Sequence, residues 1–221
     1  MKPVFIVLAL VAVVSPGVGA AGMAINIDQV PRVSGASSAL KKSLNTMRKN
    51  VESDAQNCIA NAQGSEAQGN YAAKIRKVID SRKVVVTEVT GSMMCDGVHP
   101  SSYQYGIAFE RASGKRLDLN NIYNIAIRSE GRLFIRPELV DAVAASYKQQ
   151  NERLQSCLNN SELKQDIKTL PLTFSPAPDG SIFLYYEIPS VSAGCFPSLR
   201  LPRNAIARYR SVELGSRYDL P

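Results

Sequence analysis

Four cysteines constrain the fold of this chain more than any other feature. They are Cys58, Cys95, Cys157 and Cys195, and no two of them are closer than 37 residues. Structural zinc sites usually bring cysteine ligands from short motifs, and the chain offers only one histidine, so this spacing argues against a metal site. An even number of cysteines is typical of disulfides when a chain is exported. The compartment of the protein therefore decides what its cysteines can do.

The first 20 residues have the pattern of a secretory signal peptide. Lys2 precedes an apolar run over residues 4–14, and Val18-Gly19-Ala20 supplies the small residues that a signal peptidase recognises. The run is much shorter than the roughly 20 apolar residues of a membrane-spanning helix. We therefore expect cleavage after Ala20, a single domain over residues 21–221, a periplasmic or secreted location, and no membrane span.

Two segments of similar design favour one pairing of the cysteines. Residues 37–60 and 136–158 each carry apolar side chains at helical spacing, and each helix candidate contains a cysteine near its end. Two strand candidates and a loop with the next cysteine follow in both segments: 71–79 and 83–89 in the first, 170–175 and 182–188 in the second. Equivalent units pair most simply within themselves, which predicts Cys58–Cys95 and Cys157–Cys195. The other connectivities remain open.

The remaining pattern predicts further strands joined by tight turns. Apolar and polar residues alternate over 101–110, and Ser113-Gly114-Lys115 turns the chain into a strand candidate over 116–123. Pro178-Asp179-Gly180 is a hairpin signal, and residues 196–202 form a last short strand. Residues 61–70 and the tail 214–221 have loop composition. Two main helices among about seven strands indicate an α+β fold with antiparallel pairing.

Two stretches resemble the RsiV-like extracytoplasmic domains. The stretch CDGVHPSS…YGIAFERASGKRLDLNNIY is similar to that family's histidine loop, strand and Gly-Lys turn, and residues 174–202 are similar to its closing strand segment. Asp96 stands where the family has a loop glycine, and Glu110-Arg111 replaces Asp-Leu before the turn. The matching residues are Gly97, Val98, His99, Pro100, Gly114, Lys115, Leu117, Leu119, Gly180, Tyr186, Ile188 and Gly194.

The resemblance implies a non-catalytic domain. Such domains occur as the lysozyme-sensing half of an anti-sigma factor, beside peptidoglycan deacetylases, and as free-standing periplasmic proteins. Their fold is similar to a subdomain of the heat-shock-70 ATPase, with a curved antiparallel sheet and helices on one side. We expect this fold here, in a free-standing protein.

His99 is the only histidine and thus the obvious acid or base near neutral pH. Asp96, Ser101 and Ser102 are close in sequence, but the chain lacks a nucleophile elbow, a zinc motif and a phosphate loop. We interpret His99 as a structural residue of a tight loop, with catalysis as the alternative. The sequence predicts no catalytic residue, no metal and no cofactor.

Basic residues outnumber acidic ones, and they gather in runs. Without Lys2, the 26 Lys and Arg become 25 against 19 Asp and Glu, a net charge of +6. Either these runs are solvated faces, or they attract an anionic partner. Nucleic acid is not expected outside the cytoplasm, which leaves an envelope polymer or an acidic protein. The basic residues are Lys41, Lys42, Arg48, Lys49, Lys74, Arg76, Lys77, Arg82, Lys83, Arg200, Arg203, Arg208, Arg210 and Arg217.

The two cysteine-containing loops are the predicted binding surface. Both are rich in Gly, Ser and Pro, which hold loop shape, and both offer apolar or aromatic residues suited to an interface. The predicted partner-binding residues are Met93, Met94, His99, Ser101, Ser102, Tyr103, Val191, Ser192 and Phe196. The loops predict a binding protein, and the resemblance to RsiV-like domains implies that it inhibits or senses a cell-wall hydrolase. A binder of anionic envelope polymers, or a hydrolase that uses His99, are the alternatives.

Overall fold

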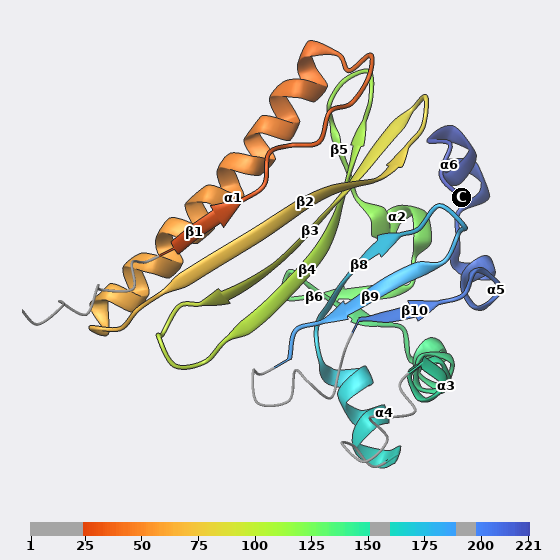
Figure 1. The fold of residues 1–221 in the computed structure, drawn as a ribbon. Coiled ribbons are helices and arrows are strands. Elements are labelled where there is room, and N and C mark those ends of the chain that lie inside the picture. Colours follow the sequence, from red (N-terminus) through yellow and green to blue (C-terminus); the bar gives the residue numbers. More distant parts are fainter. Residues whose placement is uncertain (1–23, 151–159, 189–197) are drawn as a thin grey trace, which may run out of the picture.

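The computed structural model of the chain describes residues 24–150, 160–188 and 198–221 (Figure 1). Within these ranges the strands form two five-stranded sheets flanked by helices, which confirms the α+β class. Within the same ranges, no helix has the length and apolar content needed to cross a membrane. The predicted signal peptide, Cys157 and Cys195 lie outside the described residues. The Cys157–Cys195 disulfide therefore stays a prediction.

The first sheet has the strand order β1-β2-β3-β4-β5. Strand β1 runs parallel to β2, and all other neighbours are antiparallel. The strands predicted around residues 71–79, 83–89 and 101–110 are confirmed, although β3 continues five residues further than expected. The bounds are β1 Ala24–Ile27, β2 Asn70–Asp80, β3 Val84–Met94, β4 Ser101–Glu110 and β5 Arg116–Leu117.

Helix α1 (Ser38–Gly64) packs along one face of this sheet (Figure 1). Ser37 caps its start, because the serine hydroxyl accepts a hydrogen bond from the Leu40 amide. The predicted apolar face is buried, and each fully buried Leu or Val contributes roughly 1.5–3 kcal/mol. The helix runs four residues into the predicted loop 61–70, because the apolar spacing continues to the buried Ala62.

The second sheet has the order β10-β9-β8-β7-β6 and is antiparallel throughout. The β6–β7 hairpin was not expected from the sequence. Its two turn residues, Glu130 (φ 49°) and Gly131 (φ 79°), adopt the left-handed conformation of a tight hairpin turn. The bounds are β6 Ala126–Ser129, β7 Arg132–Ile135, β8 Leu172–Pro176, β9 Ile182–Tyr186 and β10 Leu199–Leu201.

Two local predictions were wrong. Residues 119–123 form helix α2 (Leu119–Tyr123) instead of a strand, because the Asp118 carboxylate caps the amide of Asn120. The tail is not loose: it forms helix α6 (Val212–Arg217), and Leu220 after this helix is buried. The other helical segments are η1 Pro137–Leu139, α3 Val140–Gln150, α4 Asn160–Thr169, α5 Arg203–Ile206 and η4 Ala207–Tyr209.

Two apolar cores lie on opposite faces of the first sheet. Val85 and Val89 of β3 face α1, whereas Val84 and Val86 pack into the core of the second sheet. The two sheets meet where β4 approaches β8. Gly106 allows this approach, since a Cβ at that position would lie 2.7 Å from the Cβ of Ser175.

Candidate functional site

The β3–β4 hairpin ends in residues 95–100, which we call the Cys95 loop, and this loop is fixed at three points. Cys95 forms a disulfide with Cys58 of α1, with Cα atoms 4.5 Å apart, as predicted. The Asp96 carboxylate accepts hydrogen bonds from the amides of Val98 (2.9 Å) and His99 (2.8 Å). Gly97 has a φ of 74° and lies so close to Ala67 that a Cβ would clash with it. The chain therefore holds this loop in shape by itself.

The His99 ring is oriented by its own loop. Its Nδ1 lies 2.7 Å from the second carboxylate oxygen of Asp96, and within the described residues all its hydrogen bonds go to Asp96. The hydrogen bonds from the His99 and Val98 amides and from the His99 ring hold the pKa of Asp96 well below its usual value. Both side chains are exposed, and the Val98 side chain beside them is 69% exposed. The arrangement presents a histidine and a valine to solvent on a shaped loop.

Strand alternation divides the other predicted binding residues between two faces. Met93 and Ser101 are register partners that face α1. Tyr103 also faces α1, and its hydroxyl donates a 3.2 Å hydrogen bond to the Ala72 carbonyl. Ser102 points toward the second sheet, and Met94 lies on the same side of the hairpin. Met93, His99 and Ser101 line one common hollow, whereas Met94 and Ser102 lie on the other side of the hairpin. The predicted Val191, Ser192 and Phe196 lie outside the described residues.

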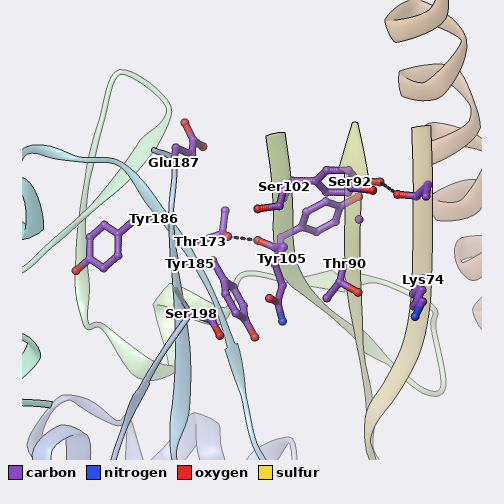
Figure 2. A pocket seen from close by; sticks show the side chains of 14 residues that line it. Lys74, Thr90, Ser92, Ser102, Tyr105, Thr173, Tyr185, Tyr186, Glu187 and Ser198 are labelled. Atoms are coloured by element: carbon purple, nitrogen blue, oxygen red, sulfur yellow. Dashed lines mark hydrogen bonds between the residues drawn. The ribbon is translucent and has the colours of Figure 1, made fainter. Parts of the chain in front are cut away.

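A hollow of about 550 Å³ lies between the two sheets; we call it the Lys74 hollow (Figure 2). Lys74, Thr90 and Gln104 are register partners on three adjacent strands, so their side chains share the face away from α1. Residues of the second sheet, including Tyr185, Thr173 and Glu187, line the opposite wall. The further lining residues are Ala72, Gly91, Ser92, Ser102, Tyr103, Tyr105, Tyr186 and Ser198.

A second hollow of about 580 Å³, the Arg116 hollow, borders the first. Tyr105, Thr173 and Glu187 line both hollows, so the two lie on either side of the β4–β8 contact. There the Thr173 hydroxyl donates a 2.6 Å hydrogen bond to the Gln104 carbonyl. The charged residues that line the second hollow are Arg116, Asp118, Arg128, Arg132 and Glu187.

A buried carboxylate fixes the two walls relative to each other. Glu88 of β3 is 1% exposed; it accepts a 2.7 Å hydrogen bond from the Tyr185 hydroxyl and a 3.0 Å bond from Arg76 Nε. Burial alone would raise the pKa of Glu88, but the hydrogen bonds from Tyr185, Arg76 and Gln104 outweigh it and lower this pKa. Burial and Glu88 together raise the pKa of Tyr185. Glu88 was not among the predicted site residues, although an acidic residue within the apolar run VVVTEV was the available signal.

Some of the basic residues are engaged within the molecule. Arg210, for example, donates to the carbonyls of Leu220 and Pro221. Lys74 and Arg116 have no ion-pair partner among the described residues, and the same holds for others such as Lys41, Lys42 and Arg203. The engaged pairs are Arg48–Glu52, Arg76–Glu88, Lys77–Asp80 and Arg200–Asp179. In the described part of the chain, no group of three or more His, Cys, Asp or Glu could hold a metal ion.

No protein-family model and no curated protein matches this chain. Among solved structures it is similar to a DUF3298 family protein from Bacteroides fragilis NCTC 9343, with 14% identity, a TM-score of 0.43, and coverage of 80% of this chain and 71% of that one. It is also similar to a DUF3298 family protein from Pseudomonas aeruginosa PAO1, with 19% identity, a TM-score of 0.36 and 66% of this chain covered. The chain spans 64% of the length of that Pseudomonas protein. Its structural neighbours are thus DUF3298 family proteins.

Proposed function

We propose that this protein is a non-catalytic binding protein of the periplasm or the extracellular space, and that its Cys95 loop contacts a wall-degrading enzyme. The signal-peptide pattern and the Cys58–Cys95 disulfide support a location outside the cytoplasm. The resemblance to RsiV-like domains supports an enzyme of the cell wall as the partner. In this proposal the protein inhibits or senses that enzyme.

The observation that carries the proposal is the shape of the Cys95 loop before any partner binds. A flexible loop loses conformational freedom on binding, at about 0.5–1.5 kcal/mol for each side chain that becomes ordered. Here the disulfide, the Asp96 carboxylate and the close packing of Gly97 already restrict the backbone. Such a loop can enter the cleft of another protein with little ordering cost, and the exposed Val98 provides an apolar contact at its tip.

The His99–Asp96 pair favours binding over hydrolysis. A histidine base needs a nucleophile within about 3.2 Å of its free nitrogen. Within the described residues, the His99 ring forms a hydrogen bond with Asp96 only, and both side chains are about half exposed. Water therefore surrounds the pair, and Asp96 serves to shape the loop.

The test is an inhibition assay with the purified mature protein against a panel of peptidoglycan hydrolases that includes lysozymes. Val98→Asp should weaken inhibition of the responsive enzyme at least about tenfold, because it places a charge in an apolar contact. Val212→Asp is the matched control: Val212 is 75% exposed on α6, so it should leave inhibition unchanged. Equal inhibition by all three proteins would show that the Cys95 loop is not the binding surface. Peptidoglycan cleavage by the protein itself, abolished by His99→Ala, would instead establish a hydrolase.

A further inference from the structure

The two hollows between the sheets have a lining chemistry of their own, separate from the Cys95 loop. No residue of the Cys95 loop lines either hollow. Hydroxyl and amide side chains dominate the lining of the first hollow, and Tyr105 lines both hollows. Each hollow has a size in the range of small-molecule sites, which is about 300–1,000 Å³. The hollows can therefore accept a ligand without involving the loop.

The residues that line the two hollows carry more positive than negative charges, and this excess remains after the ion pairs among them are counted. In the Arg116 hollow, Arg128 pairs with Asp118 at 2.9 Å, and Arg132 lies 3.8 Å from Glu187. Glu187 is also the acidic residue that lines the Lys74 hollow. Once these pairs are set aside, Lys74 and Arg116 are the remaining cationic residues, and each lines one of the hollows. Two cations in neighbouring hollows suit a ligand that carries more than one negative charge.

We propose that the two hollows bind a linear saccharide that bears carboxylate groups, with neighbouring sugar units on either side of the β4–β8 contact. Lys74 and Arg116 would each pair with a carboxylate. Thr90, Gln104 and Ser102 can both donate and accept hydrogen bonds, as the hydroxyls of a sugar require. Tyr185, which also lines the Lys74 hollow, adds an apolar wall for the C–H face of a sugar ring.

The Glu88–Tyr185 hydrogen bond fixes one wall of this site before a ligand binds. Because the Tyr185 hydroxyl is held by Glu88, the ring has one position between the sheets before a ligand arrives. The Thr173–Gln104 hydrogen bond holds the floor between the hollows in the same way. A site with fixed walls discriminates between ligands by charge and hydroxyl placement, and so an acidic saccharide should bind better than its neutral counterpart.

The test is isothermal titration of the purified mature protein with pentagalacturonate and with its methyl ester, which has the same backbone without the charges. We expect saturable binding of the acid and at least about tenfold weaker binding of the ester. Lys74→Gln and Arg116→Gln should each weaken binding of the acid about tenfold without a change in melting temperature. Lys42→Gln on the exposed side of α1 removes the same charge and should change the affinity less than about twofold.

Three outcomes would overturn the proposal: no binding of the acid at millimolar concentration, equal binding of the ester, or equal weakening by Lys42→Gln and Lys74→Gln. The last outcome would indicate a response to net charge alone. Thr90→Val gives a second check, because it removes a hydroxyl at nearly constant volume and should weaken the acid and the ester by the same factor. Val98→Asp should not affect saccharide binding, so failure here and failure of the proposed loop function are distinguishable.

Discussion

The Tyr185 hydroxyl on β9 donates a 2.7 Å hydrogen bond to the carboxylate of Glu88 on β3, and this contact ties the second sheet to the first. A carboxylate that is 1% exposed is stable only when hydrogen bonds replace the water it has lost. Arg76 and Gln104 supply the other hydrogen bonds to Glu88. The geometry of the inter-sheet hollows therefore depends on a charge that the fold must keep paired.

Replacing Tyr185 with phenylalanine should lower the free energy of unfolding by about 1.5–3 kcal/mol, the usual range for a hydrogen bond to a charged group. Urea unfolding followed by circular dichroism measures the loss. Tyr218→Phe is the control, because the Tyr218 ring packs against the core of the second sheet while its hydroxyl has no hydrogen-bond partner among the described residues. Equal stability of the two variants would contradict a stabilising role for the Glu88 contact.

The lowered pKa of Glu88 predicts a loss of stability in acid. Because the folded-state pKa lies below the unfolded value of about 4.3, the ionised carboxylate stabilises the fold above that pH. This contribution should disappear as the pH falls from the unfolded pKa through the folded one. Glu88→Gln should be less stable than the parent at pH 7 and should lose less between pH 5 and pH 3. Parallel stability curves for the two proteins over that interval would refute the assignment.

The Cys58–Cys95 disulfide closes a separation of 37 residues, which should contribute about 3–4 kcal/mol through the unfolded chain. The double variant Cys58→Ala/Cys95→Ala should lose that amount of stability and should also release the Cys95 loop. Peptide mapping without reduction should recover Cys58 linked to Cys95, and it also tests the predicted Cys157–Cys195 pair. Recovery of Cys58 linked to Cys157 would contradict both pairings.

Gly106→Ala should push the two sheets apart. The new Cβ would lie 2.7 Å from the Ser175 Cβ and 2.9 Å from backbone atoms of β8, so we expect a cost of about 1–3 kcal/mol. Gly64→Ala is the control: no atom lies within 4 Å of its Cβ position, and alanine favours the helix by up to about 1 kcal/mol. A Gly106→Ala variant as stable as the parent would mean that the sheets separate easily at this point.

Elements with a strong repeating pattern were predictable from the sequence. The buried face of α1 and the alternation along β4 each extend over ten residues or more, and both were located correctly. The β6–β7 hairpin and α2 were missed because β6, β7 and α2 are each only four or five residues long, and over that length a turn or a cap decides the structure. The tail was misjudged because its order depends on distant partners: Tyr123 donates to the Pro221 carbonyl 98 residues away.

The candidate site was predictable only in part, because some of it depends on local sequence and the rest on contacts between distant residues. The Cys95 loop is local, and its cysteine, its glycine and the Asp96–His99 spacing are all visible in the sequence. The inter-sheet hollows depend on β8 crossing β4, which brings together residues 69 positions apart, such as Gln104 and Thr173. Strand alternation indicates that Lys74, Thr90 and Gln104 share one face of the first sheet. It does not indicate which element packs against that face.

The position of β3 has a consequence for how the molecule unfolds. Val84 and Val86 belong to one apolar core, and Val85 and Val89 belong to the other. If either core unfolds, β3 is displaced, and the other core then loses its contacts with β3 as well. The two sheets should therefore lose structure in one cooperative transition. Hydrogen exchange should show matching protection for the amides of β3, α1 and β9, and near- and far-ultraviolet circular dichroism should report coincident midpoints.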